Sequence, residues 1–175
     1  WFEKHGRLDE AIEHALAAED DERAVDLIEM SAQSTIFRGE FYTFQGWVSH
    51  LPKELVCNRP NLILFYALAL IMTNSPNEEV ESWLRQVDTS SEGTASKAGV
   101  LRGYLDFLQG EFFRALPLLQ QSLDTLPPED SLFRNIATWL LSYFSIATGD
   151  FNTGTQALEI LVEKSLRKNH TIIAA

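Results

Sequence analysis

The sequence predicts an all-α fold built from stacked helix-turn-helix repeats. A pattern of glycine, an acidic residue and phenylalanine recurs at Gly39-Glu40-Phe41, Gly110-Glu111-Phe112 and Gly149-Asp150-Phe151. Gly6-Arg7-Leu8 is a looser copy near the start of the chain. In addition, no stretch alternates polar and apolar residues for long enough to form a strand.

The spacing of these copies identifies the kind of repeat. Successive glycines, starting from Gly6, are 33, 71 and 39 residues apart. The spacing of 71 equals two periods near 35, with a degenerate junction at Asn74-Ser75-Pro76-Asn77 between them. A period in this range is typical of tetratricopeptide-like repeats. The predicted architecture is therefore a right-handed superhelix of such repeats, an α-solenoid.

Each residue of the pattern has a local physical role. Glycine tolerates the left-handed conformation that ends the first helix. The acidic residue caps the second helix or complements its dipole, and the apolar residue fills the gap between the two helices. Three residues later, a small side chain lets the paired helices approach closely. The residues at that position are Ala11, Phe44, Ala115 and Gly154. Phe44 therefore marks an irregular repeat.

Apolar periodicity and turn signals place the helices in order along the chain. The predicted ranges are residues 8–17, 20–36, 40–50, 60–73, 77–88, 95–109, 111–126, 130–148 and 151–167. The longest apolar run, residues 62–72, is about half the length of a membrane-spanning helix and indicates a buried repeat helix.

The predicted domain organisation is a single solenoid. Residues 1–36 form the end of a linker and the first helical region, and residues 37–175 form the tetratricopeptide-like repeats. The chain begins at Trp1, without an initiator methionine. We therefore expect it to be a fragment of a longer protein.

Composition restricts the expected partners and location. A net charge of −11 argues against direct nucleic-acid binding, which requires a basic surface. The single cysteine, Cys57, cannot form an intramolecular disulfide, so a reducing cytoplasm is the expected location. No membrane association is expected.

Residues that could carry chemistry are sparse. The four histidines show no i, i+4 pair of the kind that binds a metal on a helix. Cys57 has no evident neighbouring base, and no glycine-rich phosphate loop is present. We therefore expect no catalytic residue, no metal site and no cofactor in this chain.

Aromatic and apolar side chains on the first helix of each pair are the candidates for ligand contact, because that helix lines the concave face of such arrays. Counting back from the junctions gives a candidate groove of Phe65, Met72, Val100, Tyr104, Phe107, Trp139 and Tyr143. Flat rings there can stack on sugars, bases or peptide side chains. The alternative is that these rings pack between neighbouring repeats.

Within that groove, Trp139 and Tyr143 form the favoured pair. They are four residues apart and therefore share one helix face. Arg102 and Asp106, on the predicted helix that carries Tyr104 and Phe107, could supply hydrogen bonds nearby or could simply be solvated.

Two passages resemble a known family. Residues 5–18, HGRLDEAIEHALAA, are similar to the segment that joins the ATPase region to the repeat region in MalT-like, LuxR-type transcriptional regulators. Residues 46–55, GWVSHLPKEL, followed by Arg59-Pro60-Asn61-Leu62, resemble a second passage of the same family in the same order. The specific part of this resemblance covers residues 1–72.

The resemblance implies an effector-sensing and protein-interaction domain of a bacterial-type transcription activator. In that family an inducer binds the repeat superhelix, and ATP-dependent self-association then permits DNA binding. The nucleotide site and the DNA-binding helices would lie outside this chain. The expected partner is a small-molecule inducer or a protein. Two alternatives remain, namely a generic tetratricopeptide adaptor for a peptide or protein, and an accessory or catalytic domain of an enzyme.

Overall fold

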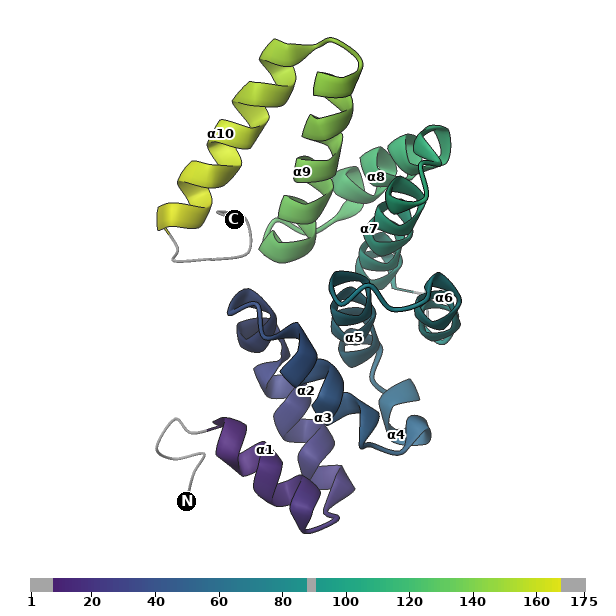
Figure 1. Cartoon of the computed structure of the whole chain (residues 1–175), viewed down its shortest axis with the longest axis vertical. Coiled ribbons are helices and arrows are strands. Elements are labelled where there is room, and N and C mark those ends of the chain that lie inside the picture. Colours follow the sequence, from purple (N-terminus) through teal and green to yellow (C-terminus); the bar gives the residue numbers. More distant parts are fainter. Residues whose placement is uncertain (1–7, 88–90, 168–175) are drawn as a thin grey trace. The chain divides into compact units, whose positions relative to one another are not determined.

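The computed structural model describes residues 8–87 and 91–167, and this part of the chain contains α-helices and no strand (Figure 1). The prediction of an all-α repeat fold is confirmed. The helices are α1 (Leu8–Ala17), α2 (Asp21–Phe37), α3 (Phe41–Ser49), α4 (Lys53–Cys57), α5 (Pro60–Met72), α6 (Asn77–Leu84), α7 (Glu92–Leu108), α8 (Phe112–Thr125), α9 (Ser131–Ala147) and α10 (Phe151–Arg167).

The chain divides into two compact units, Trp1–Val87 and Asp88–Ala175. In the first unit α2 packs against α1, α3 and α5, and α5 also packs against α3 and α6. In the second unit α7 packs against α8 and α9, and α9 packs against α10. The expected boundary between residues 36 and 37 falls at the end of α2. This domain boundary and the right-handed superhelix both stay predictions.

Five helix ends close in the same way. Just after each of these helices, one residue has a positive φ. These residues are Glu19, Gly39, Asn74, Gly110 and Gly149. In each case the next backbone N–H donates to the carbonyl five residues back, as from Glu111 to Asp106 O at 2.8 Å. This is the hydrogen bond that satisfies an exposed helix end. Asn74 therefore confirms the degenerate junction, whereas Gly6 lies outside the described residues.

Two of the acidic residues that follow the junction glycines do not cap their helices. Glu40 and Glu111 occupy N-cap positions, but neither side chain bonds to the first backbone amides of its helix. Their longer side chains differ from Asp20, whose Oδ1 accepts from the backbone N of Arg23 at 3.3 Å. For these two glutamates the capping alternative is therefore wrong, and Glu40 binds Arg38 instead. The alternative that they complement the helix dipole stays a prediction.

Close helix approach depends on glycines in the second unit. A Cβ on Gly103 of α7 would lie 2.7 Å from Leu119 Cγ of α8. A Cβ on Gly154 of α10 would lie 2.7 Å from the backbone oxygen of Ser142 in α9. Both helix pairs can therefore pack at this distance only without a side chain there.

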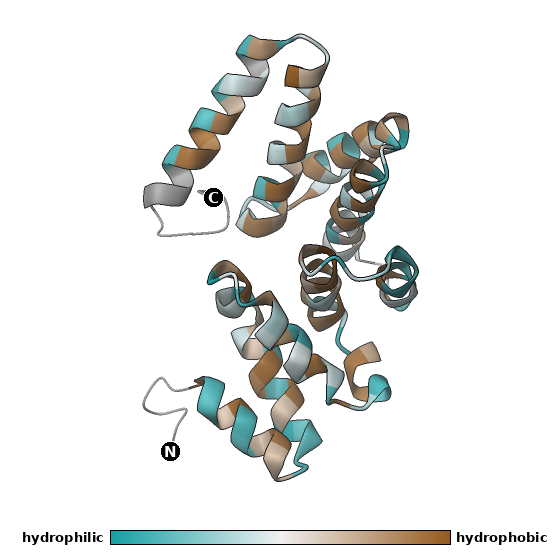
Figure 2. Ribbon diagram, in the orientation of Figure 1, coloured by the Kyte–Doolittle hydropathy of each residue, from teal (hydrophilic) through white to brown (hydrophobic). Residues whose placement is uncertain are grey.

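Helix α5 forms the centre of the first unit. Its side chains from Leu62 to Ile71 are buried except that of Phe65, which is half-buried. The helix is hydrophobic on every side, as its uniform colour shows (Figure 2). The prediction of a buried repeat helix is confirmed. Every helix of the described part is too short or too polar to cross a lipid bilayer.

Helix α4 is absent from the sequence-based prediction. It has only five residues, so it is too short to show helical periodicity. Two other ends differ: α7 begins at Glu92 rather than near residue 95, and α6 ends at Leu84 rather than near residue 88.

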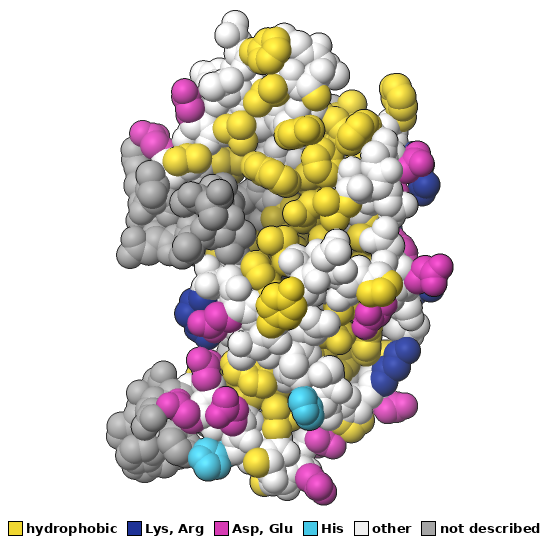
Figure 3. Space-filling model, viewed as in Figure 1, with side chains coloured by type: hydrophobic (Ala, Val, Ile, Leu, Met, Phe, Trp, Pro, Cys, Tyr) yellow, Lys and Arg dark blue, Asp and Glu magenta, His cyan; other side chains and the backbone are white. Residues whose placement is uncertain are grey.

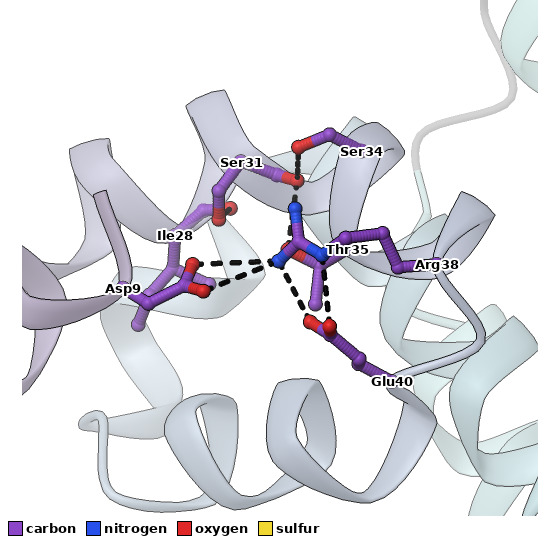
Figure 4. Close-up of polar contacts among 7 residues, drawn as sticks. All are labelled: Asp9, Ile28, Ser31, Ser34, Thr35, Arg38 and Glu40. Atoms are coloured by element: carbon purple, nitrogen blue, oxygen red, sulfur yellow. Dashed lines mark hydrogen bonds and ion pairs between the residues drawn. The ribbon is translucent and has the colours of Figure 1, made fainter. Parts of the chain in front are cut away.

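Arg38, at the end of α2, connects three helices (Figure 4). Its Nε and Nη2 donate to the two carboxylate oxygens of Glu40 at 2.9 and 2.7 Å, and Nη2 lies 3.4 Å from both oxygens of Asp9 on α1. The hydrogen bond from Arg38 lowers the pKa of the Glu40 carboxyl below its ordinary value. The side chains remain two-fifths to one-half exposed.

We expect Arg38→Met to lower the free energy of unfolding by less than about 1 kcal/mol at neutral pH, because exposed ion pairs contribute little. The pKa of Glu40 is depressed in the folded state, so its contribution is present at neutral pH and is lost as the pH falls below about 4. Urea unfolding of both proteins across this pH range measures the difference. A gap between them that widens in acid would contradict the assignment.

Candidate functional site

Six aromatic rings from three helices of the second unit form one cluster, which we call the aromatic cluster. Helices α7, α8 and α9 supply Tyr104, Phe107, Phe112, Trp139, Tyr143 and Phe144. The helical period explains how they meet, because residues three or four apart lie on one helix face. Four of the seven predicted groove residues are therefore brought together.

Phe107 lies at the centre of the aromatic cluster. Its ring centroid is 5.1 Å from that of Tyr143, 5.6 Å from that of Phe144 and 6.2 Å from that of Trp139. The planes cross at 61° to 89°, so the rings meet edge to face. Such pairs contribute about 0.5–1.5 kcal/mol each beyond the burial of their surface. The aromatic cluster therefore joins the α7–α8 hairpin to the α9–α10 hairpin.

The aromatic cluster has a buried side and an exposed side. Phe144 is 7% exposed, whereas Trp139 is 37% and Tyr143 is 50% exposed. Burial raises the pKa of the Tyr104 hydroxyl, so this group is neutral at physiological pH. Trp139 and Tyr143 therefore present ring surface to solvent while their other edges hold the two hairpins together. These two rings pack between the hairpins and also offer exposed ring surface, so the two alternatives do not exclude each other.

The remaining predicted groove residues are in different environments. Val100 is fully buried, so its side chain offers no surface to a ligand, and its assignment to the groove is corrected. Helical counting placed it on the inner row but could not show that its side chain is buried. Phe65 and Met72 belong to α5 of the first unit, where Phe65 is half-buried and Met72 is 40% exposed.

The charged groups considered with these rings are already engaged. The side chain of Asp106 is 14% exposed and lies 3.8 Å from Arg114 Nη2. Arg102 is half-buried, and it too is engaged in an interaction. The exposed rings are therefore the part of this surface that is available for contact.

The sequence did not identify Phe112 and Phe144 as members of the aromatic cluster. Phe112 is the apolar residue of the Gly110 junction, and it fills the gap as predicted, since its ring centroid is 5.8 Å from that of Phe107 and 5.6 Å from that of Phe144. Next to it, Phe113 is fully exposed. In the space-filling view, hydrophobic side chains gather over the second unit (Figure 3).

Potential metal ligands and the single cysteine also lie in the described part of the chain. Within residues 8–87 and 91–167, no group of three His, Cys, Asp or Glu side chains comes together as a metal site. Cys57 is half-buried at the end of α4.

The residues that carry the family resemblance have structural roles. Arg59, the N-cap of α5, donates to Glu29 Oε2 at 2.8 Å and to Asp26 Oδ1 at 2.7 Å on α2. Pro60 occupies the first turn of α5, where its missing N–H is tolerated. Trp47 is 6% exposed. These positions specify packing of the first unit and do not identify a ligand.

Comparison with known proteins finds relatives for part of this chain. The serine/threonine-protein kinase PknK of two Mycobacterium tuberculosis strains and of Mycobacterium bovis is 32% identical over 140 residues. The match covers 73% of this chain, and the chain spans 13% of the length of these relatives. No family model and no solved structure matches the chain. The chain is therefore similar to a short part of a much longer protein.

Proposed function

We propose that this chain is the effector-sensing and protein-interaction repeat domain of a MalT-like, LuxR-type transcription activator. In this proposal, an inducer or protein partner contacts the exposed rings of the aromatic cluster. Binding controls self-association and DNA binding by parts of the protein outside this chain. The observation that carries the proposal is a partly exposed aromatic cluster between two repeat hairpins. The net charge of −11 disfavours direct contact with nucleic acid.

The position of the aromatic cluster suggests how binding would act at a distance. Trp139 and Tyr143 lie on α9 and contact Phe107 of α7, so a ligand on the exposed rings acts on the contact between two hairpins. A ligand that prefers one hairpin arrangement shifts the population toward it by its difference in affinity. A near-complete switch requires a preference of about 10⁴-fold, or roughly 5.5 kcal/mol. Contacts between copies of the protein would supply what a small ligand does not.

The comparisons support this proposal in part. The similarity is to a short part of a protein named as a kinase, which fits a sensing or interaction segment attached to other domains. The two passages that resemble the regulator family lie in the first unit, within residues 1–72.

A tetratricopeptide adaptor that binds a peptide or protein is the second candidate. It is favoured by the large apolar side chains exposed near the aromatic cluster. Phe113 is 100%, Phe151 is 62% and Leu108 is 54% exposed. An adaptor would bind its partner without a small-molecule inducer.

The test is a thermal-shift screen of this chain against oligosaccharides, nucleotides and other metabolites, followed by calorimetry on any hit. We expect a hit to raise the melting temperature of the wild type, and we expect Trp139→Ala to weaken its binding at least tenfold, or about 1.4 kcal/mol. Met30→Ala is the matched control, because Met30 is 68% exposed in the first unit.

Three outcomes would count against the sensor proposal. Equal affinity of Trp139→Ala and the wild type would show that the ligand binds elsewhere. A collapse of the melting temperature in Trp139→Ala without ligand would show that this ring is part of the core. No hit across the panel would favour the adaptor.

A further inference from the structure

A groove of about 470 Å³ lies between α1 and α3 in the first unit, and it shares no residue with the aromatic cluster. Helix α1 contributes Glu13 and Leu16, and α3 contributes Tyr42, Gly46, Trp47 and His50. This volume is within the range of about 300–1,000 Å³ that is typical of ligand sites. None of these residues was among the groove residues predicted from the sequence.

Gly46 lies in the interior of α3, and the fold does not require a glycine there. Its φ is not positive, and a Cβ built on it meets nothing within 4 Å. Gly103 and Gly154 differ, because a Cβ on either would clash with the neighbouring helix. A glycine inside a helix is less favourable than alanine. Gly46 therefore lowers helix stability while it leaves the groove open.

The groove combines an apolar lining with groups that accept hydrogen bonds. Trp47 is 6% exposed, and Tyr42 is 76% exposed. His50 Nδ1 lies 2.6 Å from the carbonyl oxygen of Gly46. Because a carbonyl only accepts, Nδ1 of His50 donates this hydrogen bond. The carboxylate of Glu13 is an acceptor, and the hydroxyl of Thr43 can donate or accept.

Among the residues that line the groove, Glu13 is acidic and none is a lysine or an arginine. On the same helix, Asp9 is already paired with Arg38. Among the described residues, acidic side chains and histidines are visible in the lowest part of the space-filling view (Figure 3). An acidic surface attracts basic partners and repels acidic ones.

We propose that the groove between α1 and α3 docks a basic segment of a protein partner. An apolar side chain of that segment would lie over Leu16 and Trp47. A neighbouring arginine or lysine would pair with Glu13 and stack on the exposed ring of Tyr42, as cations do on aromatic faces. This interaction is independent of the aromatic cluster and goes beyond the sensing function.

The experiment is selection of a random heptapeptide display library on the immobilised chain. We expect enrichment of peptides that place arginine or lysine beside an aliphatic or aromatic residue. The most enriched peptide is then synthesised with a fluorescent label and titrated by fluorescence polarisation. We expect Gly46→Leu, which fills the groove, to weaken binding at least tenfold, and Glu13→Gln to weaken it and reduce its salt dependence.

The controls separate loss of the groove from loss of the fold. Gly46→Leu should melt at or above the temperature of the wild type, since a Cβ there meets nothing within 4 Å and leucine is the better helix former. Gln33→Leu adds the same side chain at an exposed position of α2 outside the groove and should leave binding unchanged. No enrichment, enrichment of acidic peptides, or equal binding by Gly46→Leu would overturn the proposal. A hit that depends on Trp139 instead would assign peptide binding to the aromatic cluster.

Discussion

Replacing Phe44 with alanine is expected to lower the free energy of unfolding by about 3–5 kcal/mol, the range for a fully buried phenylalanine. Phe44 lies on α3 at the position where the other repeats have alanine or glycine. The substitution therefore moves the sequence toward the regular repeat pattern, yet it leaves a cavity in the first unit. Urea unfolding followed by far-ultraviolet circular dichroism measures this change.

The matched control is Phe113→Ala, which removes the same ring from a fully exposed position on α8. Surface substitutions of this kind usually change stability by less than about 0.5 kcal/mol. Equal losses in the two variants would contradict the burial of Phe44. A gain in stability for Phe44→Ala would mean that the repeat prefers the small residue after all.

Replacing Gly154 with alanine is expected to lower the free energy of unfolding by about 1–3 kcal/mol, as overpacking does. The added Cβ would lie 2.7 Å from Ser142 O and 3.1 Å from Ile146 N, both backbone atoms of α9. Backbone atoms cannot rotate away as a side chain can, so the two helices must separate. Differential scanning calorimetry should show a lower melting temperature.

Gly46→Ala is the control with the opposite expected sign. Its Cβ meets open space, so removing an unfavourable helical glycine should stabilise the chain by about 0.5–1 kcal/mol. If both alanine variants changed stability in the same direction, the contrast between a packed and an open glycine would be wrong.

Local rules explain why most of the fold could be predicted. Gly39, Gly110 and Gly149 each adopt positive φ, because a helix end in the left-handed region favours glycine over any residue with a Cβ. Asn74 follows the same rule, since asparagine tolerates this conformation. Glu19 ends α1 in the same conformation, and nothing about a glutamate signals it.

The candidate site could be predicted only in part, because helical counting gives the face of a residue and not its cover. It grouped Tyr104 with Phe107 and Trp139 with Tyr143, and these four rings do meet. It could not show that Val100 is buried by neighbouring helices or that Phe144 completes the aromatic cluster. Those facts depend on contacts between helices that are distant in sequence.

The resemblance to the regulator family likewise informs the fold of the first unit and not the identity of a ligand. Its motif residues, among them Arg59, Pro60 and Trp47, hold the first unit together through ion pairs, a helix start and burial. Residues that pack inside a unit carry information about its fold. The side chains proposed to contact a ligand, Trp139 and Tyr143, lie outside the matching passages.

The most direct test of the central proposal is fluorine NMR of the chain labelled with 5-fluorotryptophan, titrated with the strongest hit of the metabolite screen. Four tryptophans give four signals, which single Trp→Phe variants assign. The sensing proposal predicts that the Trp139 signal shifts with ligand while the Trp83 signal on α6 stays in place. A titration that shifts Trp47 and leaves Trp139 unchanged would contradict it and move the binding site to the groove between α1 and α3.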